Sequence, residues 1–267
     1  MNFSIMVALV MLACSSPASD YAFDASVVVD QSANRQATLI LGQSNAVGQG
    51  YVTDVDPSLT ETLPSVPQSS TFAYSLTPPL AWESYDGPLR PRRGTRFGAE
   101  LSMGRGLPDH DVFECAVGAT SLSENWNPDG VWPDAAENLY AHCVAFAHAA
   151  EATHNTSVTT VVWMQGEHDA SDQDAALAYG DNLRRLAGRL LSDFPCARIV
   201  YYRLPRAETF ADEVRAGQTA VSNDPWMTMV DVDALPRLGV HFTSDGYLTL
   251  GDMIAETIST QAARCAP

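Results

Sequence analysis

The stretch that decides the fold is Ala37-Thr38-Leu39-Ile40-Leu41-Gly42-Gln43-Ser44-Asn45. Its first five residues form a short, largely apolar run, which is typical of a strand that is covered on both faces. Gly42 then allows the chain to turn sharply, and a serine between two amide side chains follows. Open α/β sheets build their binding sites at the carboxyl ends of strands, so this serine stands where a site is expected.

Four more apolar runs follow along the chain and alternate with longer amphipathic segments. Strands that alternate with helices build a parallel sheet covered on both sides, so the pattern predicts an α/β fold, a three-layer sandwich of the flavodoxin-like kind. The predicted strands cover residues 37–41, 112–117, 159–164, 198–202 and 227–232, and the predicted helices cover 134–151, 173–193, 207–221 and 245–263.

Residues 51–95 break this alternation. They are rich in Pro, Ser and Thr and show little helical periodicity. We therefore expect an irregular insertion, which in a compact domain is usually functional or poorly ordered. The chain has 267 residues, 46% of them hydrophobic, which is enough for one substantial core. The sequence accordingly predicts a single domain over residues 21–267.

The apolar segment Met1–Ala13 is too short to cross a bilayer, which needs roughly 20 residues, and it predicts a secretory signal. Met11-Leu12-Ala13-Cys14 is similar to a bacterial lipobox, in which Cys14 would carry a lipid. The alternative is an ordinary signal cleaved a few residues further on. We expect a leader and tether over residues 1–20 and an exported protein: periplasmic, extracellular, or an outer-membrane lipoprotein whose membrane contact is Cys14.

The other four cysteines indicate disulfides, because an even number in an exported chain usually pairs. Three connectivities are possible. We predict Cys115–Cys143 and Cys196–Cys265, since the last helix should pack near the strand that follows Cys196. No two of these cysteines have the CxxC spacing typical of zinc ligands, so no metal is predicted.

The net charge of -17 argues against nucleic acid as a partner. All 15 basic residues are Arg, and the acidic surplus repels phosphate backbones and anionic lipid headgroups.

Three later blocks place polar groups beside predicted strands or before a helix. Gly118 follows the strand 112–117 and would free a backbone N–H to face a ligand, as an oxyanion hole requires. Gln165 ends the strand 159–164 and could aim its amide at the same spot. His241 precedes the last predicted helix. Each block taken alone also has an ordinary structural interpretation, as a turn or a capping residue.

Taken together and in this order, the blocks resemble the SGNH hydrolases, and more narrowly the carbohydrate acetylesterases grouped with sialate O-acetylesterases and carbohydrate esterase family 6. The resemblance implies a serine esterase that removes O-acetyl groups from carbohydrates, of the sialate or xylan type, without a cofactor. The matching words run from residue 39 to residue 251 and are LILGQSNAVG, FGAEL, AVGATSLSENW, VVWMQGEHDA and GVHFTSDGYLTLG.

The resemblance also implies roles for single residues. Ser44 attacks the acyl carbonyl, and His241 takes the Ser44 proton and returns it to the leaving sugar hydroxyl. The backbone N–H groups of Ser44 and Gly118, with the Gln165 side chain, form the oxyanion hole. Glu100 falls in the word FGAEL, and we interpret it as structural.

One departure from the family pattern concerns the triad acid. The family usually places Asp three residues before the catalytic His, and here that residue is Leu238. Glu167 or Asp169 could substitute, an acid in Asp231-Val232-Asp233 could reach across, or a backbone carbonyl could orient His241 and leave a dyad. We predict Glu167 as the third catalytic residue. The alternative function is a carbohydrate-binding protein that kept the scaffold without catalysis.

Four arginines suggest the substrate class. They crowd seven residues of an acidic chain, and arginine forks bind carboxylates bidentately, so an acetylated sialic or uronic acid is one hypothesis. The alternative is that they pair with the protein's own acids. The arginines are Arg90, Arg92, Arg93 and Arg96. The predicted substrate contacts are Gln43, Asn45, Trp126, Arg92 and Arg93, with Trp82 and Trp132 as further candidates for stacking on sugar rings.

Overall fold

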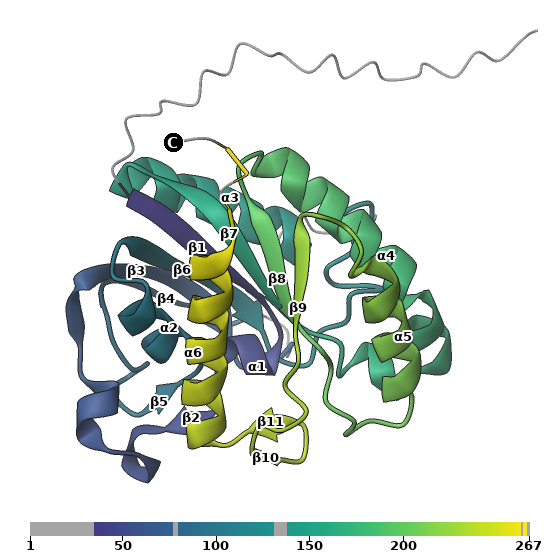
Figure 1. Cartoon of the computed structure of the whole chain (residues 1–267), viewed down its shortest axis with the longest axis horizontal. Helices are drawn as coiled ribbons and strands as arrows, with labels where there is room; N and C mark the ends of the chain where they lie inside the picture. The colour runs from purple at the N-terminus through teal and green to yellow at the C-terminus, as the bar shows by residue number, and fades with distance from the viewer. Residues whose placement is uncertain (1–34, 77–79, 131–137, 263, 266–267) are drawn as a thin grey trace, which may run out of the picture. The chain divides into compact units, whose positions relative to one another are not determined.

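The computed structural model describes residues 35–76, 80–130, 138–262 and 264–265 (Figure 1). At its centre lies a seven-stranded sheet built from β1 (Arg35–Gly42), β3 (Leu63–Ala73), β4 (Glu83–Leu89), β6 (His110–Val117), β7 (Thr156–Met164), β8 (Arg198–Tyr202) and β9 (Met227–Val230). The strand order is β4-β3-β6-β1-β7-β8-β9. All neighbours pair in parallel except β4, which runs antiparallel to β3 at the edge.

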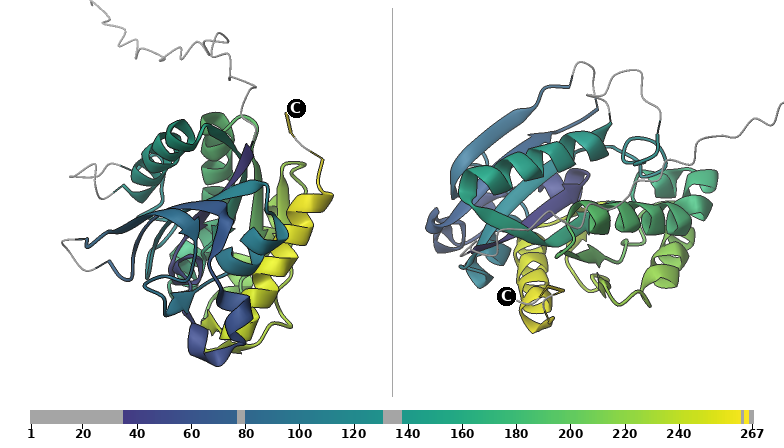
Figure 2. Two further views of the ribbon diagram at one scale, coloured as in Figure 1. Left: turned by 90° about the vertical axis from the view of Figure 1, so that its left-hand side faces the viewer. Right: turned by 90° about the horizontal axis from the view of Figure 1, so that it is seen from above.

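Helices cover both faces of the sheet, and Figure 2 shows the sheet between α3 on one side and α6 with α2 on the other. The α4 and α5 helices pack against each other. The predicted three-layer α/β fold is therefore confirmed, with a sheet that is mostly parallel. The helices are α1 (Ser44–Val47), α2 (Glu100–Gly106), α3 (Leu139–His154), α4 (Gln173–Asp193), α5 (Ala211–Val221) and α6 (Ser244–Thr260), and the 3-10 turns are η1 (Val52–Asp54), η2 (Pro57–Thr60) and η4 (Asp169–Ser171).

The expectation of an irregular insertion over residues 51–95 is wrong. This segment contains β3 and β4, which extend the sheet on one side. The half of β3 from Gln68 to Ala73 is buried between β4 and β6, although four of its six residues are polar. Backbone pairing with two neighbouring strands stabilises this strand. Its burial follows from its position in the sheet, so its polar composition does not predict a buried strand.

Both predicted disulfides are present. Cys115 in β6 pairs with Cys143 in α3 and ties that helix to the sheet, and Cys196 pairs with Cys265. Such bonds persist in oxidising compartments. The predicted leader over residues 1–20 and the lipid site at Cys14 lie outside the described residues, and these, like the single domain over 21–267, stay predictions. Among the helices of the described residues, none has the length and hydropathy of a membrane-spanning segment.

Candidate active site

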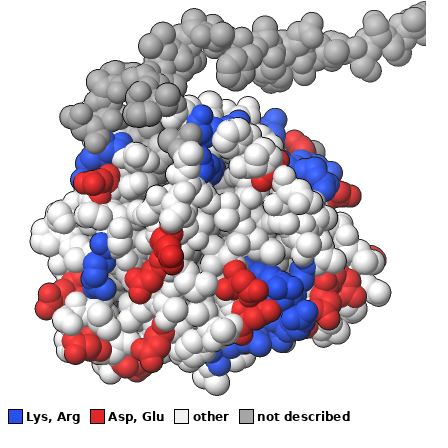
Figure 3. Space-filling model, viewed as in Figure 1, with Lys and Arg blue, Asp and Glu red and all other residues white. Residues whose placement is uncertain are grey.

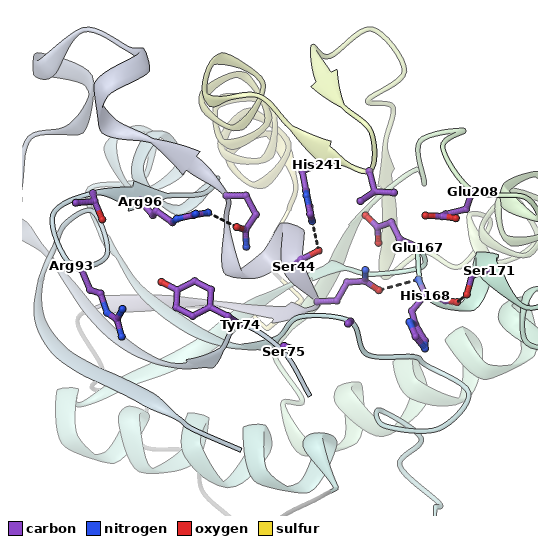
Figure 4. Close-up of a pocket in the computed structure, with 15 residues that line it drawn as sticks. Ser44, Tyr74, Ser75, Arg93, Arg96, Glu167, His168, Ser171, Glu208 and His241 are labelled. Atoms are coloured by element: carbon purple, nitrogen blue, oxygen red, sulfur yellow. Dashed lines mark hydrogen bonds between the residues drawn. The ribbon is translucent and has the colours of Figure 1, made fainter. Parts of the chain in front are cut away.

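A cleft of about 710 Å³ lies at the carboxyl edge of the sheet (Figure 4). Its walls come from the segments that follow β1, β3, β6, β7 and β8, because the carboxyl ends of parallel strands meet at one edge. The hairpin of β10 (Arg237–Leu238) and β11 (His241–Phe242) completes it. The lining residues are Gln43, Ser44, Gln49, Tyr74, Ser75, Arg93, Thr95, Arg96, Ala119, Glu167, His168, Ser171, Glu208, Val240 and His241.

Ser44 and His241 meet in this cleft although they are far apart in the sequence. Ser44 begins α1 immediately after β1, and His241 begins β11. The His241 Nε2 lies 2.9 Å from the Ser44 Oγ (Figure 4). Gly42 makes the sharp turn possible, since it has a φ of 140° and a Cβ there would collide with the Met164 carbonyl oxygen. The arrangement allows the imidazole to accept the serine proton.

The imidazole is adapted to that role by its surroundings. Burial lowers the pKa of His241 below its usual value, and the nearby positive charge of Arg96 lowers that pKa further. His241 is therefore neutral at neutral pH, as a general base must be.

Two of the predicted oxyanion donors bond to protein acceptors in this structure, and their part in an oxyanion hole stays a prediction. The Gly118 N–H donates to the Ala73 carbonyl at 3.0 Å, which extends the pairing of β3 with β6. The Gln165 Nε2 donates to the Thr120 carbonyl at 3.0 Å and to Asp169 Oδ2 at 2.6 Å, and the side chain is fully buried. Neither group lines the cleft.

Ala119 takes the place predicted for Gly118. It lines the cleft, and it has a φ of 59°, in the left-handed region. Within the described residues, the N–H groups of Ala119 and Ser44 donate to no protein acceptor. Two free N–H groups beside a nucleophile are what a tetrahedral oxyanion requires. Gly118 was predicted from the resemblance and because a glycine lets a backbone N–H face a ligand closely, whereas the residue that lines the cleft is the alanine.

The predicted third catalytic residue, Glu167, does not reach the imidazole. In the part of the chain that the structure describes, no carboxylate oxygen lies within 4.0 Å of either His241 ring nitrogen. The Glu167 Oε1 accepts instead from Asn45 Nδ2 at 2.5 Å and from the Tyr202 hydroxyl at 2.5 Å. Burial raises the pKa of Glu167.

The other acids considered for this role also have different partners. Asp169 accepts from the backbone N–H groups of Leu122 and Ser123 at 2.7 and 2.9 Å. Asp233 forms a bidentate pair with Arg215, and Asp231 pairs with Arg203. Figure 3 shows how arginine and acidic side chains group on one face of the molecule. Among the described residues no hydrogen bond reaches the His241 Nδ1, so the site is a Ser–His pair.

The predicted substrate contacts divide into two groups. Gln43 and Arg93 line the cleft. Trp126, Asn45 and Arg92 do not line it, because each side chain is buried with protein partners, and a role for them as substrate contacts stays a prediction.

Each buried side chain has a clear structural partner. The Trp126 Nε1 donates to Thr120 Oγ1 at 2.9 Å, and Arg92 lies 2.5 Å from Glu114. Asn45 holds Glu167, as described above. Trp82 stacks on His142 in α3, and Trp132 lies outside the described residues.

Arg96 is an arginine of the cluster that lines the cleft, although the predicted contact set omitted it. Its guanidinium, seen in the cleft in Figure 4, donates to Gln49 Oε1 at 2.5 Å. It also donates to the Tyr51 hydroxyl at 2.6 Å and stacks over the Tyr51 ring. No carboxylate oxygen of the described residues lies within 4.0 Å of it. An acidic chain thus keeps an unneutralised cation beside its Ser–His pair.

A mostly parallel α/β sheet with a serine and a histidine in contact at its carboxyl edge is an arrangement found in α/β serine hydrolases. Within this class, the chain belongs to the family described as "carbohydrate esterase, sialic acid-specific acetylesterase", which matches residues 34–260. As a member of this family it is a carboxylic ester hydrolase, and the resemblance drawn from the sequence is confirmed.

Two proteins illustrate the relationship. A probable carbohydrate esterase of Arabidopsis thaliana is 24% identical over 243 residues, which cover 83% of this chain and 89% of the plant protein. Its crystal structure matches with a TM-score of 0.64 at 21% identity, over 86% of this chain and 100% of that one. The structure of NanS matches with a TM-score of 0.63 at 18% identity, over 85% and 97% of the two chains.

Proposed function

We propose that this protein is an exported serine esterase that removes O-acetyl groups from carbohydrates, with Ser44 as nucleophile and His241 as general base. The contact of 2.9 Å between His241 Nε2 and Ser44 Oγ, inside a cleft at the carboxyl edge of the sheet, carries the proposal. Membership of a carbohydrate esterase family supports it.

The reaction follows from the groups present. Ser44 Oγ attacks the acetyl carbonyl carbon while His241 Nε2 takes the hydroxyl proton, and the N–H groups of Ser44 and Ala119 bind the oxyanion. The intermediate collapses when His241 returns the proton to the leaving sugar oxygen, which leaves acetyl-Ser44. Water attacks this ester with His241 as base, and acetate and free Ser44 result.

The substrate is an acetylated acidic sugar, such as a sialic or uronic acid. Arg96 supports this choice because it lines the cleft without an acidic partner, and a sugar carboxylate would neutralise it. The description of the family as sialic acid-specific agrees with that choice. In wild type, kcat/KM should be higher for an acetylated sialic acid than for acetylated xylose, and equal values would reject the acidic class.

Export is part of the proposal as well. The apolar segment at residues 1–13 has the composition of a secretory signal, and the two disulfides suit an oxidising compartment. Fractionation of cells that express the full chain tests this, and recovery with the reduced cytosolic proteins would reject it.

Hydrolysis of an aryl acetate tests the catalytic pair. Ser44→Ala should abolish it, because the substitution removes the hydroxyl that forms the acyl-enzyme. Ser69→Ala is a matched control, since the Ser69 Oγ also lies 2.9 Å from a histidine, Nε2 of His154, but outside the cleft. Hydrolysis that survives in Ser44→Ala rejects the proposal. A wild type that binds acetylated sugars without hydrolysing them would favour the non-catalytic alternative. That alternative is supported by the lack of a carboxylate oxygen within 4.0 Å of the His241 ring nitrogens among the described residues.

A further inference from the structure

His241, the base of the proposed reaction, is well placed for proton transfer. Among the described residues, however, no hydrogen bond reaches its Nδ1. In serine hydrolases a triad acid fixes the orientation of the imidazole, and its loss is costly. Here no carboxylate oxygen of the described residues lies within 4.0 Å of the His241 ring nitrogens. Its Nε2 nevertheless lies at hydrogen-bond distance from Ser44 Oγ. Some other contact must therefore fix the position of His241.

That contact is made to the backbone next to the histidine. The Asn45 Nδ2 donates to the Val240 carbonyl at 3.0 Å. Val240 is in the turn of the β10–β11 hairpin, and Asn45 follows Ser44 in α1. One side chain thus joins the strand of the base to the helix of the nucleophile.

Asn45 is itself held by a buried network. The Glu167 Oε1 accepts from its Nδ2, and the Tyr247 hydroxyl donates to its Oδ1 at 2.7 Å. The Tyr202 hydroxyl donates to the same oxygen of Glu167. All four side chains are almost fully buried, so the amide of Asn45 has one allowed orientation. Both of its protons are used, one on Glu167 and one on Val240.

We propose that Asn45 and Glu167 are positioning residues that replace the missing triad acid by holding the His241 backbone, through the Val240 carbonyl, against Ser44. The inference rests on the proposed Ser44–His241 mechanism. The network sets where the ring lies but contacts neither ring nitrogen, so it acts on the backbone rather than on the charge of the imidazole. Glu167 contributes an acceptor oxygen to Asn45.

The aryl acetate assay separates this role from that of a catalytic acid. Glu167→Ala should lower kcat ~100-fold with little change in KM, because the proton transfer depends on the placement of the base. Glu167→Gln keeps an acceptor oxygen for Asn45 and Tyr202 and should stay within ~5-fold of wild type. Thr38→Val controls for the loss of a buried hydrogen-bonding side chain, since Thr38 bonds to His110 and lies in β1 outside the cleft.

Leu238→Asp supplies the decisive comparison. Leu238 pairs directly with His241 in the hairpin, so a carboxylate there would lie on the same face as the imidazole. It should raise kcat ~10-fold or more in an Asn45→Ala background, where the hydrogen bond from Asn45 to the Val240 carbonyl (the clamp) is absent, and at most ~3-fold in wild type. Tyr247→Phe removes one support of Asn45, and it provides a milder background should Asn45→Ala fail to fold.

The inference is overturned if folded Glu167→Ala keeps the wild-type kcat, if Glu167→Gln loses as much as Glu167→Ala, or if Leu238→Asp gains as much in wild type as in the clamp variants. The proposed function fails differently: wild type would then show no hydrolysis that depends on Ser44.

Discussion

Arg92 and Arg96 are four residues apart in the sequence and have opposite surroundings. The Arg92 side chain is 4% exposed and lies 2.5 Å from Glu114 and 3.5 Å from Glu100, both fully buried. Arg96 lies in the cleft and is held by two neutral side chains, Gln49 and Tyr51. One arginine pairs with the protein's own acids, and the other has no carboxylate partner within 4.0 Å among the described residues.

The difference shows that arginines that lie close together in a sequence need not share one role. Its members go wherever the fold offers partners, and only a cation without a carboxylate partner can offer its full charge to a substrate. The two hypotheses drawn from the cluster therefore apply to different residues. Internal pairing describes Arg92 and Arg93, which pairs with Glu83, and ligand binding stays a proposal for Arg96.

The largest effect is expected on the buried side of this comparison. Arg92→Met leaves Glu100 and Glu114 buried without their cation, which should cost ~3–5 kcal/mol of unfolding free energy. Denaturant titration measures it. Arg96→Gln is the comparison variant and should change stability by less than ~1 kcal/mol, since its partners are neutral. Equal losses of stability in the two variants would erase the distinction between the sites.

A smaller effect concerns the proton on Glu114, which is buried beside Arg92. Burial raises the pKa of Glu114 to about 8, and this outweighs the attraction of Arg92. Because the folded state then keeps a proton that the unfolded state releases above its usual pKa of 4.5, stability should fall as pH rises through this range, by at most ~1.4 kcal/mol per pH unit.

Glu114→Gln tests this interpretation, because the amide mimics the protonated acid and keeps an acceptor for Arg92. The variant and wild type should be about equally stable near pH 5, and the variant should be more stable by ~3–4 kcal/mol at pH 8. Denaturation curves at several pH values measure the difference. A variant that is less stable than wild type at pH 8 would show that the ionised carboxylate is the native form.

On the cleft side, Arg96→Gln should lower kcat/KM for an acetylated sialic acid ~10–100-fold, the usual range for one charge-assisted contact. For acetylated xylose the change should stay within ~3-fold. Arg105→Gln removes the same charge from α2, where the side chain bonds only to backbone carbonyls, and should affect neither substrate. A loss of equal size on both sugars would remove Arg96 from substrate recognition.

The sequence predicts the centre of the sheet better than its edge. Buried parallel strands such as residues 37–41 and 159–164 are continuous apolar runs, and α4 has the predicted bounds because its apolar face repeats along its whole length. The strand β3 lacks such a pattern, since its buried half consists mostly of hydroxyl and amide side chains. Only the pairing with β4 and β6 reveals it.

The strand β3, which the sequence did not predict, also decides between Gly118 and Ala119 as the residue with a free N–H. Whether Gly118 or Ala119 offers a free N–H depends on which one pairs with Ala73, the last residue of β3. Ser44 and His241 were predictable, because the turn after β1 and the late histidine are local motifs in a fixed order. The partners of Glu167 were not, since two distant elements, α1 and β8, supply them.

The smallest expected effect is that of the Arg96 charge on the pKa of His241. The positive charge of Arg96 is one of two causes that lower the pKa of His241, after burial. Since the base must be neutral, activity is lost as pH falls through this pKa, and the acid limb of kcat/KM in wild type should lie below the ordinary histidine value of 6.5. Arg96→Gln removes the repulsion and should move the limb upward, by less than ~1 pH unit because burial remains. A neutral aryl acetate is the right substrate, since its binding does not involve the arginine charge. Arg105→Gln should leave the limb in place. A limb that stays fixed or moves downward in Arg96→Gln would mean that the guanidinium does not act on the imidazole, and its position in the cleft would then serve binding alone.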